Sequence, residues 1–250
     1  MNIYGDRGNV ISIAQRARWR GIDVEIREVN VGERGDFADV GVFFFGGGQD
    51  KEQIAVSEDL QGDTGQRLIE AVEDGAALLS ICGGYQLLGE YFKTGTGESL
   101  PGISLFDAYT VAGDRRFIGD TIVDCDPTTW GDAAGGLVGS RTLLGFENHS
   151  GKTYLRGGCR PLGKAVVGFG NNGEDGFEGA IYKGAVGSYL HGSLLPKNPW
   201  LTDHLIRVGL SRHERDVVLS PLDDAVEDRA HEAVIERIRQ RGRLQSAIKK

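Results

Sequence analysis

The sequence has few cysteines, and they are not arranged as a disulfide framework or a zinc site requires. Its 250 residues contain three, Cys82, Cys125 and Cys159, which is an odd number. There is no Cys-x-x-Cys pair and no His-Glu-x-x-His segment, so we predict no metal site. This scarcity argues against a disulfide-rich secreted domain and favours a protein of the reducing cytoplasm.

The sequence also lacks a long apolar run, a phosphate-binding loop and an excess of basic residues. No stretch is apolar and long enough to span a bilayer, and Met1–Gly8 lacks the apolar core of a signal peptide. The net charge of −8 argues against nucleic acid as the main partner. Gly151-Lys152-Thr153 is similar to the end of a P-loop, but Phe146 stands where that motif needs glycine. We therefore expect no ATP site in this chain.

What is present is an alternation of apolar runs and helical patterns in the first third of the chain. Helices are predicted over 9–20 and 66–74, and strands over 1–4 (the end of a first strand), 24–29, 39–45 and 76–81. This alternation predicts an α/β fold with a doubly wound, mostly parallel sheet flanked by helices. Short strand-like segments follow, and we expect them as antiparallel additions to that one sheet: 117–123, 142–147, 164–170 and 179–182.

The chain closes with two predicted helices, over 199–210 and 223–240. We expect one enzymatic domain over 1–210 and a C-terminal helical extension over 211–250, packed on or beside it. The last helix carries an apolar stripe of Val226, Ala230, Val234 and Ile238. Packing of this stripe against the protein's own sheet is favoured over docking to a partner.

Cys82 is the strongest candidate for chemistry. The apolar run 76–81 leads into it, and Gly83, Gly84 and a helix-like pattern follow. This order is typical of a nucleophile elbow between a strand and a helix. The N–H groups at the start of that helix favour a thiolate, so we predict a nucleophile that attacks a carbonyl carbon. The alternative is a cysteine buried as a small hydrophobe.

A cysteine nucleophile needs a base, and His191 is the first candidate because it ends a predicted strand over 184–190. Active sites of open parallel sheets lie at the carboxyl ends of the strands, so His191 and Cys82 are expected to meet. His149 is the second candidate. The other histidines lie in predicted helices or charged stretches: His204, His213 and His231.

An oxyanion hole needs two N–H groups directed at the developing charge. The N–H of Gly83, directly after the nucleophile, is one candidate. We assign the other to Gly48 in the loop 46–48, which follows the predicted strand 39–45. Gly47 in the same loop lets the backbone approach a substrate closely and is a candidate substrate contact.

These features together resemble the class I glutamine amidotransferases, and within them the branch that contains cobyric acid synthase. The similarity is greatest to the glutaminase subunits of lipid II isoglutaminyl synthases. It extends from Met1 to about Arg207. Six segments carry it: 4–9, 45–50, 82–86, 117–120, 145–151 and 189–192.

The resemblance implies that Cys82 attacks the side-chain amide of L-glutamine and that His191 transfers the protons. Ammonia would then pass to a Mur-ligase-like partner subunit, MurT, which amidates D-glutamate in the peptidoglycan stem peptide. ATP and Mg²⁺ would belong to that partner, so no cofactor is expected in this chain. The complex would work in the cytoplasm, at the inner face of the membrane, on a lipid-linked substrate.

The resemblance also assigns the remaining site residues. Arg116 is the candidate for the α-carboxylate of glutamine, because a guanidinium offers two hydrogen bonds, and Arg115 is its alternative. Many class I enzymes orient the histidine with a glutamate two residues later, where this chain has Ser193. Glu147 is the candidate orienter instead.

Two other hypotheses stay open. The chain is an amidotransferase for another acceptor, such as a corrinoid, or it is a DJ-1-like redox or interaction module. The last would have no need of His191 at a strand end.

Overall fold

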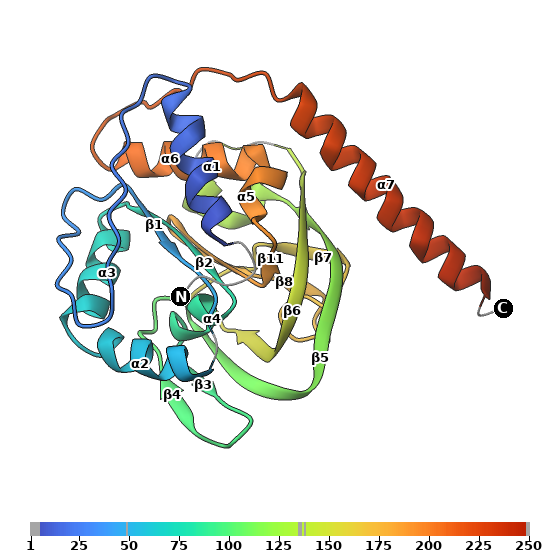
Figure 1. Cartoon of the computed structure of the whole chain (residues 1–250), viewed down its shortest axis with the longest axis horizontal. Helices are drawn as coiled ribbons and strands as arrows, with labels where there is room; N and C mark the ends of the chain where they lie inside the picture. The colour runs from blue at the N-terminus through green and yellow to red at the C-terminus, as the bar shows by residue number, and fades with distance from the viewer. Residues whose placement is uncertain (1–5, 49, 135–136, 138, 249–250) are drawn as a thin grey trace.

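The computed structural model of the chain describes residues 6–48, 50–134, 137 and 139–248. The strand end predicted at 1–4 lies outside the described residues. Figure 1 shows a body of two sheets with helices around them, and one long helix, α7, that leaves this body.

The first sheet has the strand order β1-β2-β10-β9. β1, β2 and β10 are parallel, and β9 is antiparallel to β10. Every residue of β2 is buried, as its mostly apolar run predicts, and its one polar side chain, Ser80, donates to the carbonyl of Val186 at 3.2 Å. The strands of this sheet are β1 (Val42–Phe45), β2 (Ala77–Ile81), β9 (Ala180–Tyr182) and β10 (Ala185–Ser188).

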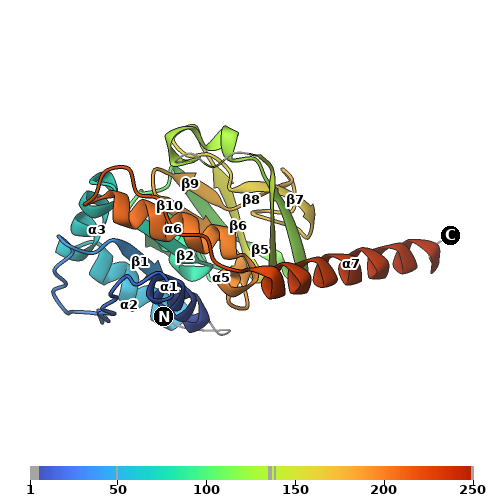
Figure 2. The ribbon, with the colours of Figure 1, turned by 90° about the horizontal axis from the view of Figure 1, so that it is seen from above.

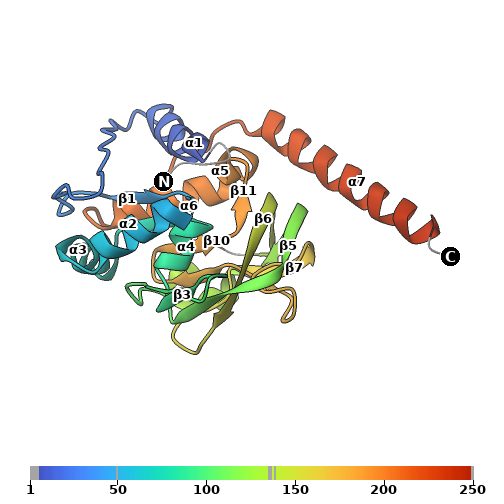
Figure 3. The same cartoon turned by 60° about the horizontal axis from the view of Figure 1, so that its bottom comes forward.

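Helices cover both faces of this sheet, as a doubly wound arrangement requires (Figure 3). Leu79 and Ile81 of β2 pack in a core with residues of α1 and α6, while Leu78 points to the opposite core with α3 and α4. The helices are α1 (Arg7–Arg18), α2 (Asp50–Leu60), α3 (Asp63–Glu73), α4 (Gly83–Leu87), α5 (Leu194–Lys197) and α6 (Pro199–Ser211).

Of the four predicted antiparallel segments, 179–182 is an addition to the first sheet, as β9, whereas the other three lie in a second sheet. Its path is β11-β6-β5-β3-β4, with β7 on β5 and β8 on β7. The strands are β3 (Tyr91–Lys93), β4 (Ser99–Pro101), β5 (Ala108–Cys125), β6 (Arg141–Leu155), β7 (Gly163–Val167), β8 (Phe177–Glu178) and β11 (Leu190–His191). A 3₁₀ helix, η1 (Pro127–Ala134), follows β5. β10 and β11 are separated only by Tyr189, so the chain passes directly from one sheet to the other at His191.

α7 (Ala225–Ile248) is longer than the predicted 223–240, and Figure 2 shows its C-terminal end reaching past both sheets. Only part of its apolar stripe is buried. Ile238 is buried against Ile122 and Leu144 of the β5–β6 hairpin, whereas Val226 is 66% exposed. Among the residues that the structure describes, no helix has the length and apolar character to cross a bilayer.

One local prediction was wrong, and one helix was not predicted. The segment 24–29 alternates like a strand, but 22–30 form neither strand nor helix, and Ile26 and Val29 are 51% and 44% exposed. Alternation indicates a strand only where a neighbour supplies backbone hydrogen bonds, and no described strand pairs there. The sequence prediction also missed α2, which begins in the loop after β1.

Candidate active site

The candidate site is built around Cys82, which directly follows β2. Its backbone has φ 51° and ψ −107°, an unfavourable conformation for a residue with a side chain. The N–H of Cys82 donates to the carbonyl of Ser188 at 2.8 Å, which fixes the turn to the end of β10. The strand thus ends in a strained turn that holds the half-buried thiol at the start of α4.

The glycines after Cys82 are required by the close approach of α4 to the loop 46–48. A Cβ on Gly83 would lie 2.6 Å from Nε2 of Gln53 and 3.1 Å from N of Gly48. A Cβ on Gly84 would lie 2.6 Å from the carbonyl oxygen of Phe45. The start of α4 therefore fits against this loop only without side chains.

The two predicted oxyanion donors are brought together by this packing. Among the described residues, no hydrogen-bond acceptor takes the N–H of Gly48 or of Gly83. The N–H of Gly47, by contrast, has an acceptor: it donates to Oδ2 of Asp6 at 2.9 Å. The N–H of Gly47 therefore fixes the loop, which places the nitrogen of Gly48 beside the start of α4.

His191 lies where the two sheets meet, and the structure brings it to Cys82. Its side chain is 1% exposed, and its Nδ1 lies 3.6 Å from Oδ1 of Asp6. Burial alone lowers the pKa of His191, but hydrogen bonding and charge from Asp6 and from Cys82 outweigh burial and raise this pKa to about 9. The imidazole is therefore protonated at neutral pH.

Asp6 is the site residue that the sequence analysis missed as a functional group. It occupies the N-cap position of α1, but its side chain makes no capping hydrogen bond. The carboxylate is fully buried and directed at His191 and Gly47 instead. The segment 4–9 drew attention only through resemblance, and an aspartate before a helix is ordinarily interpreted as a cap.

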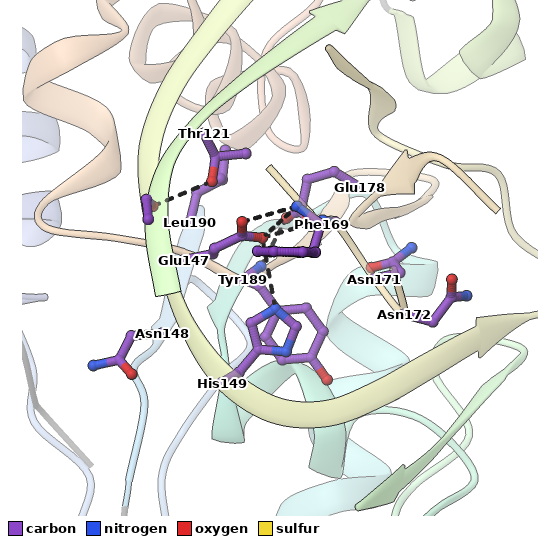
Figure 4. A network of polar contacts seen from close by, with 12 residues as sticks. Thr121, Glu147, Asn148, His149, Phe169, Asn171, Asn172, Glu178, Tyr189 and Leu190 are labelled. Carbon is purple, nitrogen blue, oxygen red and sulfur yellow. Dashed lines mark hydrogen bonds and ion pairs between the residues drawn. The ribbon is translucent and has the colours of Figure 1, made fainter. Parts of the chain in front are cut away.

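Glu147, the predicted orienter, lies elsewhere. It faces Leu190 in the register of β6 with β11, so its side chain is on the opposite face of the sheet from His191. Its carboxylate accepts the N–H groups of Phe169 and Gly170 at 2.8–3.1 Å (Figure 4). Glu147 therefore orders a loop behind the sheet and does not reach the imidazole of His191.

His149, the second candidate base, belongs to the same inner face. Its ring stacks on Tyr189 with centroids 3.6 Å apart, and Nδ1 pairs with the carbonyl of Gly151 at 2.7 Å. Figure 4 shows Asn148 on the other side of β6 from Glu147 and His149. The structure thus favours His191 over His149 as the partner of Cys82.

Arg116 is an exposed residue of β5. Its Nε donates to Oδ1 of Asn148 at 2.7 Å, and Asn148 shares a face of β6 with Phe146, the residue opposite His191. No described carboxylate forms an ion pair with Arg116. Arg115 differs, because its guanidinium lies over the ring of Phe169 at 4.6 Å. Of the two arginines, Arg116 has the more available charge.

The arrangement combines a cysteine in a strained turn, a protonated imidazole and the neighbouring backbone nitrogens of Gly48 and Gly83. These are the parts that nucleophilic cleavage of an amide requires. Among the described residues, no group of three or more histidine, cysteine, aspartate or glutamate side chains is placed to hold a metal ion.

Comparisons with known proteins also indicate amide chemistry on glutamine. The CobB/CobQ-like glutamine amidotransferase domain family matches residues 1–199. Subunit GatD of the glutamine-hydrolysing lipid II isoglutaminyl synthase of Staphylococcus aureus is 39% identical over 237 residues, 95% of this chain and 91% of that protein. The subunit of the same name from Streptococcus pneumoniae is 34% identical over 226 residues, 90% and 82% of the two chains.

A solved structure supports the fold. A chain of PurLQS from Thermotoga maritima aligns with a TM-score of 0.52 at 13% identity, covering 80% of this chain and 88% of that chain. At this identity the similarity concerns the fold alone.

Proposed function

The chain belongs to the CobB/CobQ-like glutamine amidotransferase family, and on that premise we propose that it hydrolyses L-glutamine as the glutaminase subunit of a lipid II isoglutaminyl synthase. The observation that carries the proposal is the strained Cys82 beside the imidazole of His191. Near-complete coverage by two relatives named as such subunits supports the acceptor.

In the first half-reaction, the thiolate of Cys82 attacks the side-chain amide carbon of glutamine. The carbonyl oxygen becomes an oxyanion, and the N–H groups of Gly48 and Gly83 stabilise its charge. His191, protonated at neutral pH, donates its proton to the amide nitrogen as the C–N bond breaks. Ammonia leaves, and the glutamyl group stays on Cys82 as a thioester.

In the second half-reaction, the now neutral His191 takes a proton from water as the water oxygen attacks the thioester carbon. The same two N–H groups stabilise the second oxyanion. The C–S bond breaks, glutamate leaves, and the sulfur and imidazole return to their starting states. One glutamine and one water thus give one glutamate and one ammonia.

Arg116 selects the substrate in this scheme. Its guanidinium forms hydrogen bonds to the α-carboxylate of glutamine while its Nε stays bonded to Asn148. A ligand that lacks the α-carboxylate is bound weakly, because it cannot form the hydrogen bonds to Arg116. The backbone around Gly47 lies against the substrate.

The ammonia passes to an ATP-dependent, Mur-ligase-like partner subunit, MurT, which amidates D-glutamate in the stem peptide of lipid II. ATP and Mg²⁺ act on the partner, and this chain contributes no cofactor of its own. The complex works in the cytoplasm and meets its lipid-linked substrate at the inner face of the membrane.

Ammonia release from glutamine tests the first part of the proposal. The purified complex of this chain with its ligase should release ammonia, Cys82→Ala should abolish the release, and Cys159→Ser should not. Cys159 is the matched control, because it is a buried free cysteine whose Sγ donates to the carbonyl of Asp107, a bond that serine retains. Normal ammonia release by Cys82→Ala would contradict the proposal.

Capture of the partner tests the acceptor. A tagged chain should co-purify with a Mur-ligase-like protein, and the pair should amidate lipid II when given glutamine and ATP. Co-purification with a corrinoid synthetase instead would assign another acceptor. If a glutamine-analogue electrophile fails to label Cys82 and peroxide nevertheless oxidises Cys82, a redox module would be favoured.

A further inference from the structure

The carboxylate of Asp6 contacts two parts of the candidate site at once. One oxygen accepts the N–H of Gly47 at 2.9 Å, and the other lies 3.6 Å from Nδ1 of His191. The side chain is fully buried, so water does not compete for either oxygen. A buried carboxylate in this position is costly unless both contacts compensate for its lost hydration.

The position of Asp6 is fixed by the start of α1. Oδ1 of Asn9 accepts the N–H of Leu195 at 2.9 Å, which attaches this first turn to the chain just after His191. A Cβ on Gly8 would lie 2.2 Å from Oγ of Ser193, so the absence of a side chain at Gly8 permits the contact. The segment 6–9 thus packs directly on the chain that follows the imidazole.

We propose that Asp6 is the positioning residue of the site, and that its single carboxylate sets both the orientation of His191 and the loop that presents the Gly48 N–H. Ser193 occupies the sequence position at which many class I enzymes have an orienting glutamate, and Asp6 supplies the carboxylate from the other end of the chain. Asp6 would support the glutamine hydrolysis proposed above. Only the expected change in kcat rests on that proposed function.

This arrangement makes the base and the oxyanion donor depend on one group. A carboxylate at Nδ1 holds the proton on that nitrogen, so that Nε2 of neutral His191 is left as the acceptor. The same carboxylate holds the N–H of Gly47, and the next nitrogen along the chain, that of Gly48, would lie 3.1 Å from a Cβ on Gly83. Movement of Asp6 would therefore disturb both parts together.

Two variants separate the contacts. Asp6→Asn keeps an oxygen for the Gly47 N–H and removes the charge at His191. We expect the pKa of His191, followed by NMR, to fall by about one pH unit or more, and kcat for glutamine hydrolysis by the complex to fall by about 10²-fold or more, with KM little changed. Asp6→Ala should also raise the hydrogen-exchange rate of the Gly47 amide.

Ser57→Ala is the control, because Ser57 is a buried polar residue of α2 whose hydroxyl donates to the carbonyl of Pro101 at 2.7 Å rather than to Asp6 or His191. It should lower thermal stability and leave the pKa of His191 unchanged. An unchanged His191 pKa in Asp6→Asn, or unchanged Gly47 exchange in Asp6→Ala, would overturn the inference.

A measurement on the unmodified chain keeps the inference testable if the variants do not fold. Above its pKa, His191 should carry its remaining proton on Nδ1, which ¹⁵N shifts of the ring report, and an Nε2–H tautomer would overturn the role of Asp6. These readouts do not use glutamine. Absence of ammonia release by the unmodified complex would therefore reject the proposed function and leave the test of Asp6 intact.

Discussion

At the scale of single residues, the chemistry of the site depends on the surroundings of one imidazole. Burial opposes a charge on His191, and the nearby groups Asp6 and Cys82 reverse that effect. The result is a proton donor that is charged at neutral pH and lies beside the sulfur. A leaving amine needs such a donor, because expulsion of an unprotonated amide nitrogen is unfavourable.

Removal of the sulfur should therefore change the titration of the histidine. In Cys82→Ala, we expect the pKa of His191 to fall below about 9, because one of the two groups that raise it is gone. NMR titration of the five histidines measures this directly, with Cys159→Ser as the control. In the unmodified complex, hydrolysis should decline above a pH of about 9, where His191 loses the proton that it donates. A His191 pKa unaffected by Cys82→Ala would contradict the close pairing.

A methyl group on Gly83 should damage the oxyanion hole. It would meet Nε2 of Gln53 at 2.6 Å and crowd N of Gly48 at 3.1 Å, which displaces one or both donors. We expect Gly83→Ala to lower kcat for ammonia release by about 10²-fold or more. Gly157→Ala is the control, since its Cβ would meet nothing within 4 Å. Equal rates for the two variants would argue against a donor at Gly83.

At the scale of secondary-structure elements, α7 uses only the middle of its apolar stripe. Val234 and Ile235 are half-buried and Ile238 is buried, on the same patch of the β5–β6 hairpin, while Val226 and Ala230 are exposed. Arg241 lies 3.6 Å from Asp120 at the edge of this patch. The helix is therefore attached to the second sheet at one point.

Loss of this attachment should release the helix. Ile238→Ala removes most of the side chain that α7 buries against Ile122 and Leu144, and we expect faster hydrogen exchange throughout α7. Val226→Ala, at an exposed position of the same helix, should leave the exchange unchanged. The opposite order of effects would show that α7 is held elsewhere.

At the scale of the whole molecule, one arginine joins segments that are far apart in the chain. Arg16 of α1 donates to both carboxylate oxygens of Asp203 in α6 and of Asp224, directly before α7, at 2.6–2.9 Å. Burial alone lowers the pKa of Arg16, but hydrogen bonds to these carboxylates outweigh it and hold the pKa above its usual value. Since α1 also positions Asp6, this cluster connects the framework to the site.

Removal of this guanidinium should destabilise the fold. Arg16→Ala leaves Asp203 and Asp224 without their shared cation, and we expect the free energy of unfolding to fall by about 2–3 kcal/mol, measured in urea. Arg34→Ala is the control, because Arg34 is 83% exposed and lies 3.8 Å from Asp63. A loss no larger than that of Arg34→Ala would show that the cluster contributes little.

The sequence by itself determined the features that depend on near neighbours in the chain. An apolar run before Cys82 predicted β2, and two glycines after it predicted the elbow, because strand burial and tight turns are local demands on residue type. The strand predicted over 184–190 also led to His191, although the structure divides it into β10 and β11 and places His191 in the second sheet. The alternation of apolar and polar residues at 24–29 predicted a strand wrongly, because no neighbouring strand pairs with this segment.

Only the tertiary structure decided which distant groups meet. Glu147 and Asp6 are both acidic residues in segments of the same resemblance, and nothing local tells which one faces His191. The register of β6 with β11 turns Glu147 away, and the packing of α1 beside the loop 46–48 brings Asp6 in. The buried carboxylate of Asp6 acquires its role from Gly47 and His191, 41 and 185 residues away in the chain, and only the folded chain places them in contact.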